Sequence, residues 1–123
     1  MITNTVRECL KDEGIVSIVT NGVEFPHVVN TWNSYVIITS NDEFLIPVGR
    51  MAQTEENLKT CDKVLMTLGS RNVEGLKYIG TGFLIEGSAR FETSGDNFEE
   101  MKAKCEWIRA ALVVNPSKIE QTL

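Results

Sequence analysis

The densest group of side chains suited to ligand binding lies between Val29 and Tyr35, in the sequence VNTWNSY. It places a Trp, a Tyr, two Asn, a Thr and a Ser within seven residues of a chain that has two Trp, two Tyr and five Phe. Aromatic rings stack on planar ligands, and amides and hydroxyls bond to the polar edge of such a ligand. The alternative is a hairpin corner with one buried Trp and the polar residues of a turn. Residue types alone leave both interpretations open.

A second segment, IPVGRMAQTE, reads as the end of a strand, a glycine and the start of a helix. Backbone N–H groups at a helix start, with the Thr54 hydroxyl and the Arg50 charge, are suited to binding a phosphate. Glu55 and Glu56 stand where they would repel a dianion, and the glycine pattern matches neither a P-loop nor a dinucleotide-binding loop. An ordinary strand-to-helix turn is the alternative.

Groups of side chains typical of acid–base or nucleophilic catalysis are lacking. His27 is the only histidine, so a Ser-His-Asp triad would need it, and the chain has no G-x-S-x-G sequence. The acidic pairs Asp12-Glu13, Glu55-Glu56 and Glu99-Glu100 are chain neighbours on expected helices, where their side chains diverge. We therefore predict no catalytic residue and no metal site, and expect a cofactor to carry any chemistry.

Hydrophobic periodicity and turn residues predict the strands and helices on which these segments lie. Strands are predicted at residues 15–20, 27–32, 35–39, 44–48, 64–68, 83–91 and 109–114. Short helices are predicted after a cap at Thr3 or Asn4 with Gly14 as the stop, over 54–61 with Thr54 as N-cap, and from 94–96 onward. Asn21-Gly22 predicts a hairpin turn, residues 69–82 a polar connection, Gly87 a bulge, and Pro116 the start of a polar tail.

About seven strands and three short helices in 123 residues predict one mainly β domain, an antiparallel barrel closed by helices. The net charge of -5 and the scattered Lys and Arg exclude a general nucleic-acid binder. The longest apolar run, Ala110 to Val114, is too short for a membrane span, and the N-terminus has no leader pattern. We expect a cytoplasmic protein whose three scattered cysteines form no disulfide framework.

Six segments together resemble the small prokaryotic FMN-binding proteins of the split-barrel superfamily, which also contains pyridoxamine 5'-phosphate oxidases and flavin reductases. The segments are HVVNTWNSY, IPVGRMAQTE, VLMTLGSR, GTGFLIEGSA, WIRAALVV and the terminal EQTL. They span essentially the whole chain and occur in the family's order. The resemblance implies a single split β-barrel domain over residues 1–123 and a homodimer. FMN would be held noncovalently at the dimer interface by residues of both chains.

The resemblance also assigns site residues. Those expected at the isoalloxazine and ribityl chain are Asn30, Thr31, Trp32, Asn33 and Tyr35. The backbone expected along the polar edge of the ring is that of Pro47, Val48 and Gly49. Those expected at the phosphate and ribityl chain are Met51, Gln53 and Thr54. The partner's Trp107 and the partner's Leu123 are expected to cover the flavin.

One departure from the family pattern concerns the phosphate. The family has a Lys where this chain has Gln53, and a Gly where this chain has Arg50. The positive charge has therefore moved three residues along the chain, and Arg50 becomes the substitute for the lysine. A helix start and hydroxyls can hold the rest of the phosphate charge.

The leading functional hypothesis is an FMN-dependent redox protein that passes electrons between partners or acts as an NAD(P)H:flavin reductase. A pyridoxamine 5'-phosphate oxidase-like activity is less favoured, because the chain is short and lacks a second basic cluster for a substrate phosphate. A non-catalytic flavin-binding dimeric barrel is the alternative from a different class. The expected partners are a second copy of the chain and a redox protein or NAD(P)H.

Overall fold

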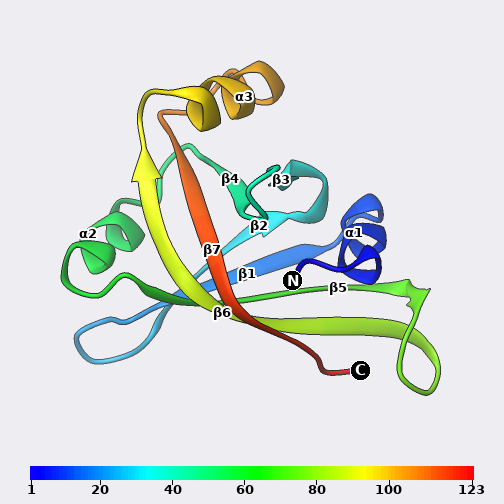
Figure 1. Ribbon diagram of the computed structural model, residues 1–123. Coiled ribbons are helices and arrows are strands. Elements are labelled where there is room, and N and C mark those ends of the chain that lie inside the picture. Colours follow the sequence, from blue (N-terminus) through cyan, green and yellow to red (C-terminus); the bar gives the residue numbers. More distant parts are fainter.

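The computed structural model describes residues 1–123, and its strands form one antiparallel sheet in the order β2-β1-β5-β6-β7-β4-β3 (Figure 1). The strands are β1 (Ile15–Thr20), β2 (His27–Trp32), β3 (Ile37–Ile38), β4 (Phe44–Val48), β5 (Lys63–Glu74), β6 (Ile79–Glu92) and β7 (Ala110–Gln121). The helices are α1 (Asn4–Lys11), α2 (Ala52–Thr60) and α3 (Asp96–Lys104), with a 3-10 turn η1 at Asn33–Tyr35. The predicted mainly β, seven-stranded architecture with three short helices is confirmed.

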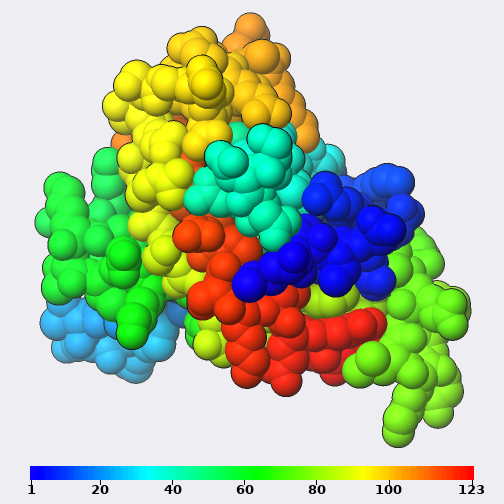
Figure 2. Space-filling model, in the orientation of Figure 1, coloured from blue at the N-terminus to red at the C-terminus, as the bar shows by residue number.

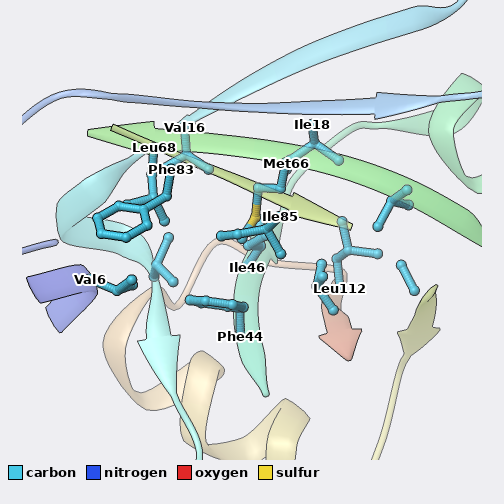
Figure 3. Packing of buried hydrophobic residues seen from close by; sticks show 14 of the residues in the cluster. Val6, Val16, Ile18, Phe44, Ile46, Met66, Leu68, Phe83, Ile85 and Leu112 are labelled. Atoms are coloured by element: carbon cyan, nitrogen blue, oxygen red, sulfur yellow. The ribbon is translucent and has the colours of Figure 1, made fainter. Parts of the chain in front are cut away.

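The long strands β6 and β7 bend strongly, so that the sheet curls and its two halves face each other (Figure 1). Figure 3 shows the interior, where Val16, Ile18 and Met66 point from β1 and β5 toward Phe44 and Ile46 of β4. Residues of β5 alternate between buried and exposed, which is the pattern of a strand with one solvent face. This curled sheet is the half-barrel of a split barrel.

Strand β4 is buried on both faces, from Phe44 to Val48. Phe44 and Ile46 belong to the main core, whereas Leu45 packs with Met101 and Ile108 in a smaller cluster under α3. Helix α3 therefore covers the outer side of β4, as Figure 1 shows. None of the three α-helices is long and apolar enough to cross a lipid bilayer.

Helix α1 begins as predicted, because the Thr3 hydroxyl accepts a hydrogen bond from the Val6 amide. It buries Val6 and Cys9 and ends at Lys11, three residues before the predicted stop at Gly14. The preceding N-terminal residues lie against the β3–β4 turn, where the Ile2 amide donates to Asp42 Oδ2 at 3.3 Å (Figure 2).

Two carboxylates fasten the C-terminal end of α1 to the sheet. Ser70 Oγ donates to Asp12 Oδ2 at 2.6 Å, and Ser34 Oγ donates to Glu13 Oε2 at 2.7 Å. Hydrogen bonds from Ser70 and Asn72 hold the pKa of Asp12 below its usual 3.8, and those from Ser34 hold the pKa of Glu13 below 4.5.

These shifts predict a loss of stability in acid. A carboxylate with a lowered pKa in the folded state stabilises that state above its unfolded pKa, and this contribution disappears as pH falls through the folded pKa. We expect the urea concentration at the unfolding midpoint to decrease when the pH is lowered below about 4. In Asp12→Asn this decrease should be smaller. Glu24→Gln, on the exposed β1–β2 loop, is the control that removes one charge without removing such a bond. Equal pH profiles for the two variants would contradict this assignment.

The hairpin between β5 and β6 is the main correction to the predicted elements. Residues 69–82 form no polar connection: β5 continues to Glu74, β6 starts at Ile79, and only four residues turn between them. Gly69 pairs with Gly82, and a Cβ at Gly69 would lie 2.6 Å from the Thr81 carbonyl oxygen. Glycine and asparagine are depleted in strands, but here Gly69 permits close backbone contact between β5 and β6.

Strand β7 also extends further than predicted, through Pro116 to Gln121. The register shifts between Glu86 and Gly87, where Gly87 faces Pro116, so the predicted irregularity at Gly87 is confirmed. Ser117 Oγ donates to the Glu86 carbonyl at 3.1 Å. At a bulge the ladder of hydrogen bonds is interrupted, so a proline, which has no N–H to donate, is tolerated there. This explains why Pro116 does not end the strand.

Two further turns differ from prediction. The β1–β2 connection spans residues 21–26 instead of a two-residue Asn-Gly turn, although the hairpin itself is present. The strand predicted at 35–39 is reduced to Ile37–Ile38, because residues 33–35 wind into η1. This turn redirects the chain at the edge of the sheet, beside a cavity that Trp32 and Tyr35 line.

Candidate functional site

A cavity of about 370 Å3 opens between the edge strand β2, the turn η1, the end of β4 and the segment after α3. It is lined by Val29, Asn30, Thr31, Trp32, Tyr35, Pro47, Gly49, Arg50, Met51 and Trp107. The volume lies within the range of roughly 300–1,000 Å3 for small-molecule sites. All lining residues except Val29 are among the site residues predicted from the sequence.

The aromatic side chains give this cavity its character. Trp32 and Trp107 remain 45% and 53% exposed, which is unusual for such large rings. Tyr35 and Trp107 are in contact, with ring centroids 5.9 Å apart at an interplanar angle of 55°. A Cβ at Gly49 would lie 3.1 Å from Trp107 Cζ3, so the glycine lets the indole lie close to the backbone. Together these groups form an open aromatic surface beside exposed backbone, which fits a planar polar ring.

A helix start lies directly beside this surface. Met51 precedes α2 in the left-handed conformation, with φ 60° and ψ 35°, and no side chain caps the helix. The first N–H groups of an α-helix have no acceptor within the helix. Thr54, predicted as the N-cap, is instead the third helical residue; it is fully buried and its Oγ1 has no hydrogen-bond partner. Unpaired donors of this kind at a helix start are suited to an anion.

Several predicted site residues lie outside the cavity. Val48 belongs to the main core. Gln53 Nε2 donates to Asn57 Oδ1 at 2.8 Å, and Asn57 Nδ2 donates to Thr20 Oγ1 at 3.1 Å. The Gln53 side chain therefore lines a separate hollow under the β1–β2 loop.

Asn33 is fully buried and links three elements. Its Nδ2 lies within hydrogen-bond distance of the carbonyl oxygens of Cys9, Asp12 and Gly69, at 3.2, 2.9 and 3.0 Å. The backbone amide of Asn33 also donates to the Gly14 carbonyl at 2.9 Å. Asn33 thus joins the end of α1, β5 and η1. It does not line the cavity, although its neighbours Trp32 and Tyr35 do.

Leu123 and Trp107, both predicted to cover the partner's flavin, are placed differently. The Leu123 main-chain oxygen accepts from Thr81 Oγ1 at 2.9 Å and from the Leu76 amide at 3.1 Å, and Leu123 does not line the cavity of its own chain. Trp107 lines that cavity, because β7 returns from α3 to pair with β4. The contact of Trp107 with the partner's flavin, which the resemblance implies, stays a prediction.

Val29 and Arg109 were not among the predicted site residues. Val29 and Thr31 share one face of β2 while Trp32 lies on the other, and all three reach the cavity because β2 is the free edge of the sheet. Arg109 does not line the cavity; its guanidinium bonds to the turn before α2. The only sequence signal was its place two residues after Trp107 in the WIR sequence.

A larger cavity of about 510 Å3 lies elsewhere, over β5, β6 and β7 near the Gly87 bulge. Its lining is mainly polar and includes Lys63, Glu86 and Asn115, with no aromatic side chain. It therefore lacks the stacking surface that a planar ring requires, and the smaller cavity is the better candidate.

Comparison with known proteins gives the family. Residues 2–122 match the family model described as pyridoxamine 5'-phosphate oxidase. The FMN-binding protein of Nitratidesulfovibrio vulgaris (strain DSM 19637 / Miyazaki F) is 50% identical over 123 residues, and the match covers all of both chains.

Solved structures share the fold at low sequence identity. HupZ of Group A Streptococcus aligns with a TM-score of 0.79 at 16% identity, over 98% of this chain and 94% of that chain. An FMN-binding protein of Syntrophomonas wolfei subsp. wolfei aligns with a TM-score of 0.73 at 15% identity, over 98% and 85%. The family match over nearly the whole sequence and the 50% identical relative show that this chain belongs to the pyridoxamine 5'-phosphate oxidase family.

Proposed function

We propose that this protein binds FMN in the cavity between β2 and the end of β4 and carries electrons in redox reactions. The observation that carries the proposal is the pairing of two exposed indoles, Trp32 and Trp107, with the uncapped start of α2. A flavin mononucleotide has the matching parts, a planar ring system and a phosphate joined by a polar chain. The FMN-binding relative, 50% identical over the whole length, supports the same ligand.

The residues present fit each part of FMN. Trp32 and Trp107 offer stacking surface for the ring, and the backbone of Pro47 and Gly49 offers hydrogen-bonding groups for its polar edge. Asn30 and Thr31 supply polar groups for the ribityl hydroxyls. The unpartnered Thr54 hydroxyl and the free N–H groups of α2 suit the phosphate.

Bound FMN supplies one- and two-electron transfer chemistry. Trp32 and Trp107 exclude water from the ring and so disfavour added negative charge there, which lowers the reduction potential. Tyr35 and Arg50 are the only titratable side chains in the cavity lining, which contains no His, Lys or carboxylate. Such a lining favours electron carriage over an oxidase reaction that needs a proton acceptor beside the substrate.

We also propose a homodimer in which the partner's Leu123 closes the site. The cavity is open to solvent, and Leu123, which is 64% exposed, does not line the cavity of its own chain. Thr81 and Gln121 hold the terminal residue in place by hydrogen bonds to its carbonyl oxygen. A fixed apolar terminus of this kind is suited to covering a ring on a second copy.

The test is reconstitution of the apoprotein with FMN, followed by visible spectroscopy and an anaerobic NAD(P)H titration. We expect saturable binding of one flavin per chain, and stoichiometric reduction without turnover. Failure to bind FMN would overturn the proposal. Sustained NAD(P)H oxidation when excess free FMN is added as the electron acceptor would replace the electron carrier with a flavin reductase. Oxidation of pyridoxamine 5'-phosphate in the presence of O2 would replace it with an oxidase.

Arg50 is expected to matter more for FMN affinity than Gln53. Arg50 is exposed and lines the cavity, whereas the Gln53 amide is bonded to Asn57 over a different hollow. Removing a charged hydrogen-bond donor from a phosphate costs roughly tenfold in affinity. We therefore expect Arg50→Ala to raise the Kd of FMN by about tenfold and Gln53→Ala by less than about twofold. Equal or reversed losses in a fluorescence titration would show that the positive charge has not moved to Arg50.

A further inference from the structure

The guanidinium of Arg109 joins three elements beside the candidate phosphate site. Its Nε and Nη2 donate to the Arg50 carbonyl oxygen at 3.0 and 2.6 Å, and its Nη1 pairs with Glu55 Oε1 at 3.0 Å. Its Cζ lies 5.6 Å from the ring centre of Phe91 on β6. The planar fork of arginine allows these contacts at once, which the ammonium of lysine cannot reproduce.

The first consequence concerns the turn that sets the direction of α2. The Arg50 carbonyl lies immediately before Met51, the left-handed residue from which α2 starts. A non-glycine residue holds this conformation only where its surroundings enforce it. The backbone amide of Arg109 also donates to the Val48 carbonyl at 2.9 Å, so Arg109 fixes the chain on both sides of Gly49. The direction of the first N–H groups of α2 therefore depends on Arg109.

The second consequence concerns charge. Glu55 lies in the first turn of α2, where an acidic side chain competes with a bound anion for the helix start. Arg109 pairs with Glu55 and offsets its charge. The neighbouring Glu56 pairs with Lys59 at 3.1 Å on the exposed side of the helix. Glu55 and Glu56, whose charges argue against phosphate binding when only the sequence is considered, are thus both paired with cations in the structure.

We propose that Arg109 is a positioning residue for the phosphate end of bound FMN, because it fixes the turn before α2 and neutralises Glu55. The inference rests on the proposed FMN function. It makes a prediction that a purely structural role would not: loss of Arg109 weakens ligands that carry the phosphate more than ligands that lack it.

The test compares FMN with riboflavin, which has the same ring and ribityl chain without the phosphate. Kd values are measured by quenching of flavin fluorescence for wild type, Arg109→Ala and Arg109→Lys. For Arg109→Ala we expect an FMN affinity about tenfold lower and a riboflavin affinity changed by less than about threefold. Arg109→Lys keeps the charge without the fork, and its FMN affinity should fall between the other two.

Two further variants separate the causes. Glu55→Gln combined with Arg109→Ala removes the exposed carboxylate and should recover part of the lost FMN affinity. Arg90→Ala is the matched control, because Arg90, like Arg109, is an arginine paired with carboxylates, here Glu43 and Glu92, but it does not contact the turn before α2. Thermal melting of each apoprotein separates loss of fold from loss of affinity.

The outcomes are distinguishable. Equal losses for FMN and riboflavin in Arg109→Ala, or no loss for either, would overturn the role of Arg109 while leaving FMN binding by the wild type intact. A wild type that binds neither flavin would overturn the proposed function itself. A loss of FMN affinity in Arg90→Ala as large as in Arg109→Ala would also contradict the inference.

Discussion

Trp32→Ala should weaken FMN binding by about one to two orders of magnitude. Stacking of a planar base on an aromatic side chain is worth roughly 1–3 kcal/mol in alanine substitutions, and a flavin ring offers a larger face. Trp32 is the exposed indole on β2 at the mouth of the cavity, and without it Trp107 is the one remaining indole of the lining. Fluorescence titration of the apoprotein with FMN measures the change. The variant should also raise the reduction potential, because water would reach the ring.

The matched control for this prediction is Phe25→Ala. Phe25 is an equally prominent exposed aromatic residue, 78% exposed on the β1–β2 loop, but it does not line the cavity. We expect its loss to leave the Kd of FMN unchanged. An unchanged Kd in Trp32→Ala, or equal losses in both variants, would remove Trp32 from the flavin site.

Asn33→Asp should lower the free energy of unfolding by about 2–4 kcal/mol. The substitution replaces a buried N–H donor with an oxygen that faces the carbonyl oxygens of Cys9, Asp12 and Gly69. A buried polar group left without a partner costs about 1–3 kcal/mol, and more when it carries charge. Because three elements meet at Asn33, few alternative contacts can compensate. Urea unfolding of the apoprotein measures the difference.

Asn41→Asp provides the comparison for Asn33→Asp. Asn41 lies in the exposed turn before β4, so the same chemical change there should cost less than about 0.5 kcal/mol. If the two variants unfold at the same urea concentration, the network around Asn33 does not stabilise the fold as described. Loss of FMN affinity in Asn33→Asp at full stability would return Asn33 to the flavin site that the sequence predicted.

Most of the fold was accessible from sequence because β1, β5 and β6 alternate between buried and less buried residues, and β4 is a short, continuously apolar run. The predicted limits held where β-branched residues dominate, as in β1 (Ile15–Thr20) and β2 (His27–Trp32). They failed at the β5–β6 hairpin and at Pro116, where small residues and a bulge replace the usual pattern. At those places strand pairing depends on contacts with distant residues, which local propensity does not contain.

Much of the candidate site was also accessible, because two short segments of the chain supply nearly all of its lining. Residue type alone could not separate Asn30, which lines the cavity, from Asn33, which is turned into the interior by η1. Nor could it identify Arg109, because its contacts are with Arg50 and Glu55, which lie 59 and 54 positions earlier in the chain. Such roles depend on tertiary geometry and not on local pattern.

The most direct measurement for the central claim is a crystal structure of the protein grown with FMN. We predict the isoalloxazine ring against Trp32 in the cavity between β2 and β4, with the phosphate at the start of α2 near Thr54 and Arg50. A flavin found instead in the larger polar cavity beside Lys63 and Glu86, or a phosphate directed away from α2, would contradict it.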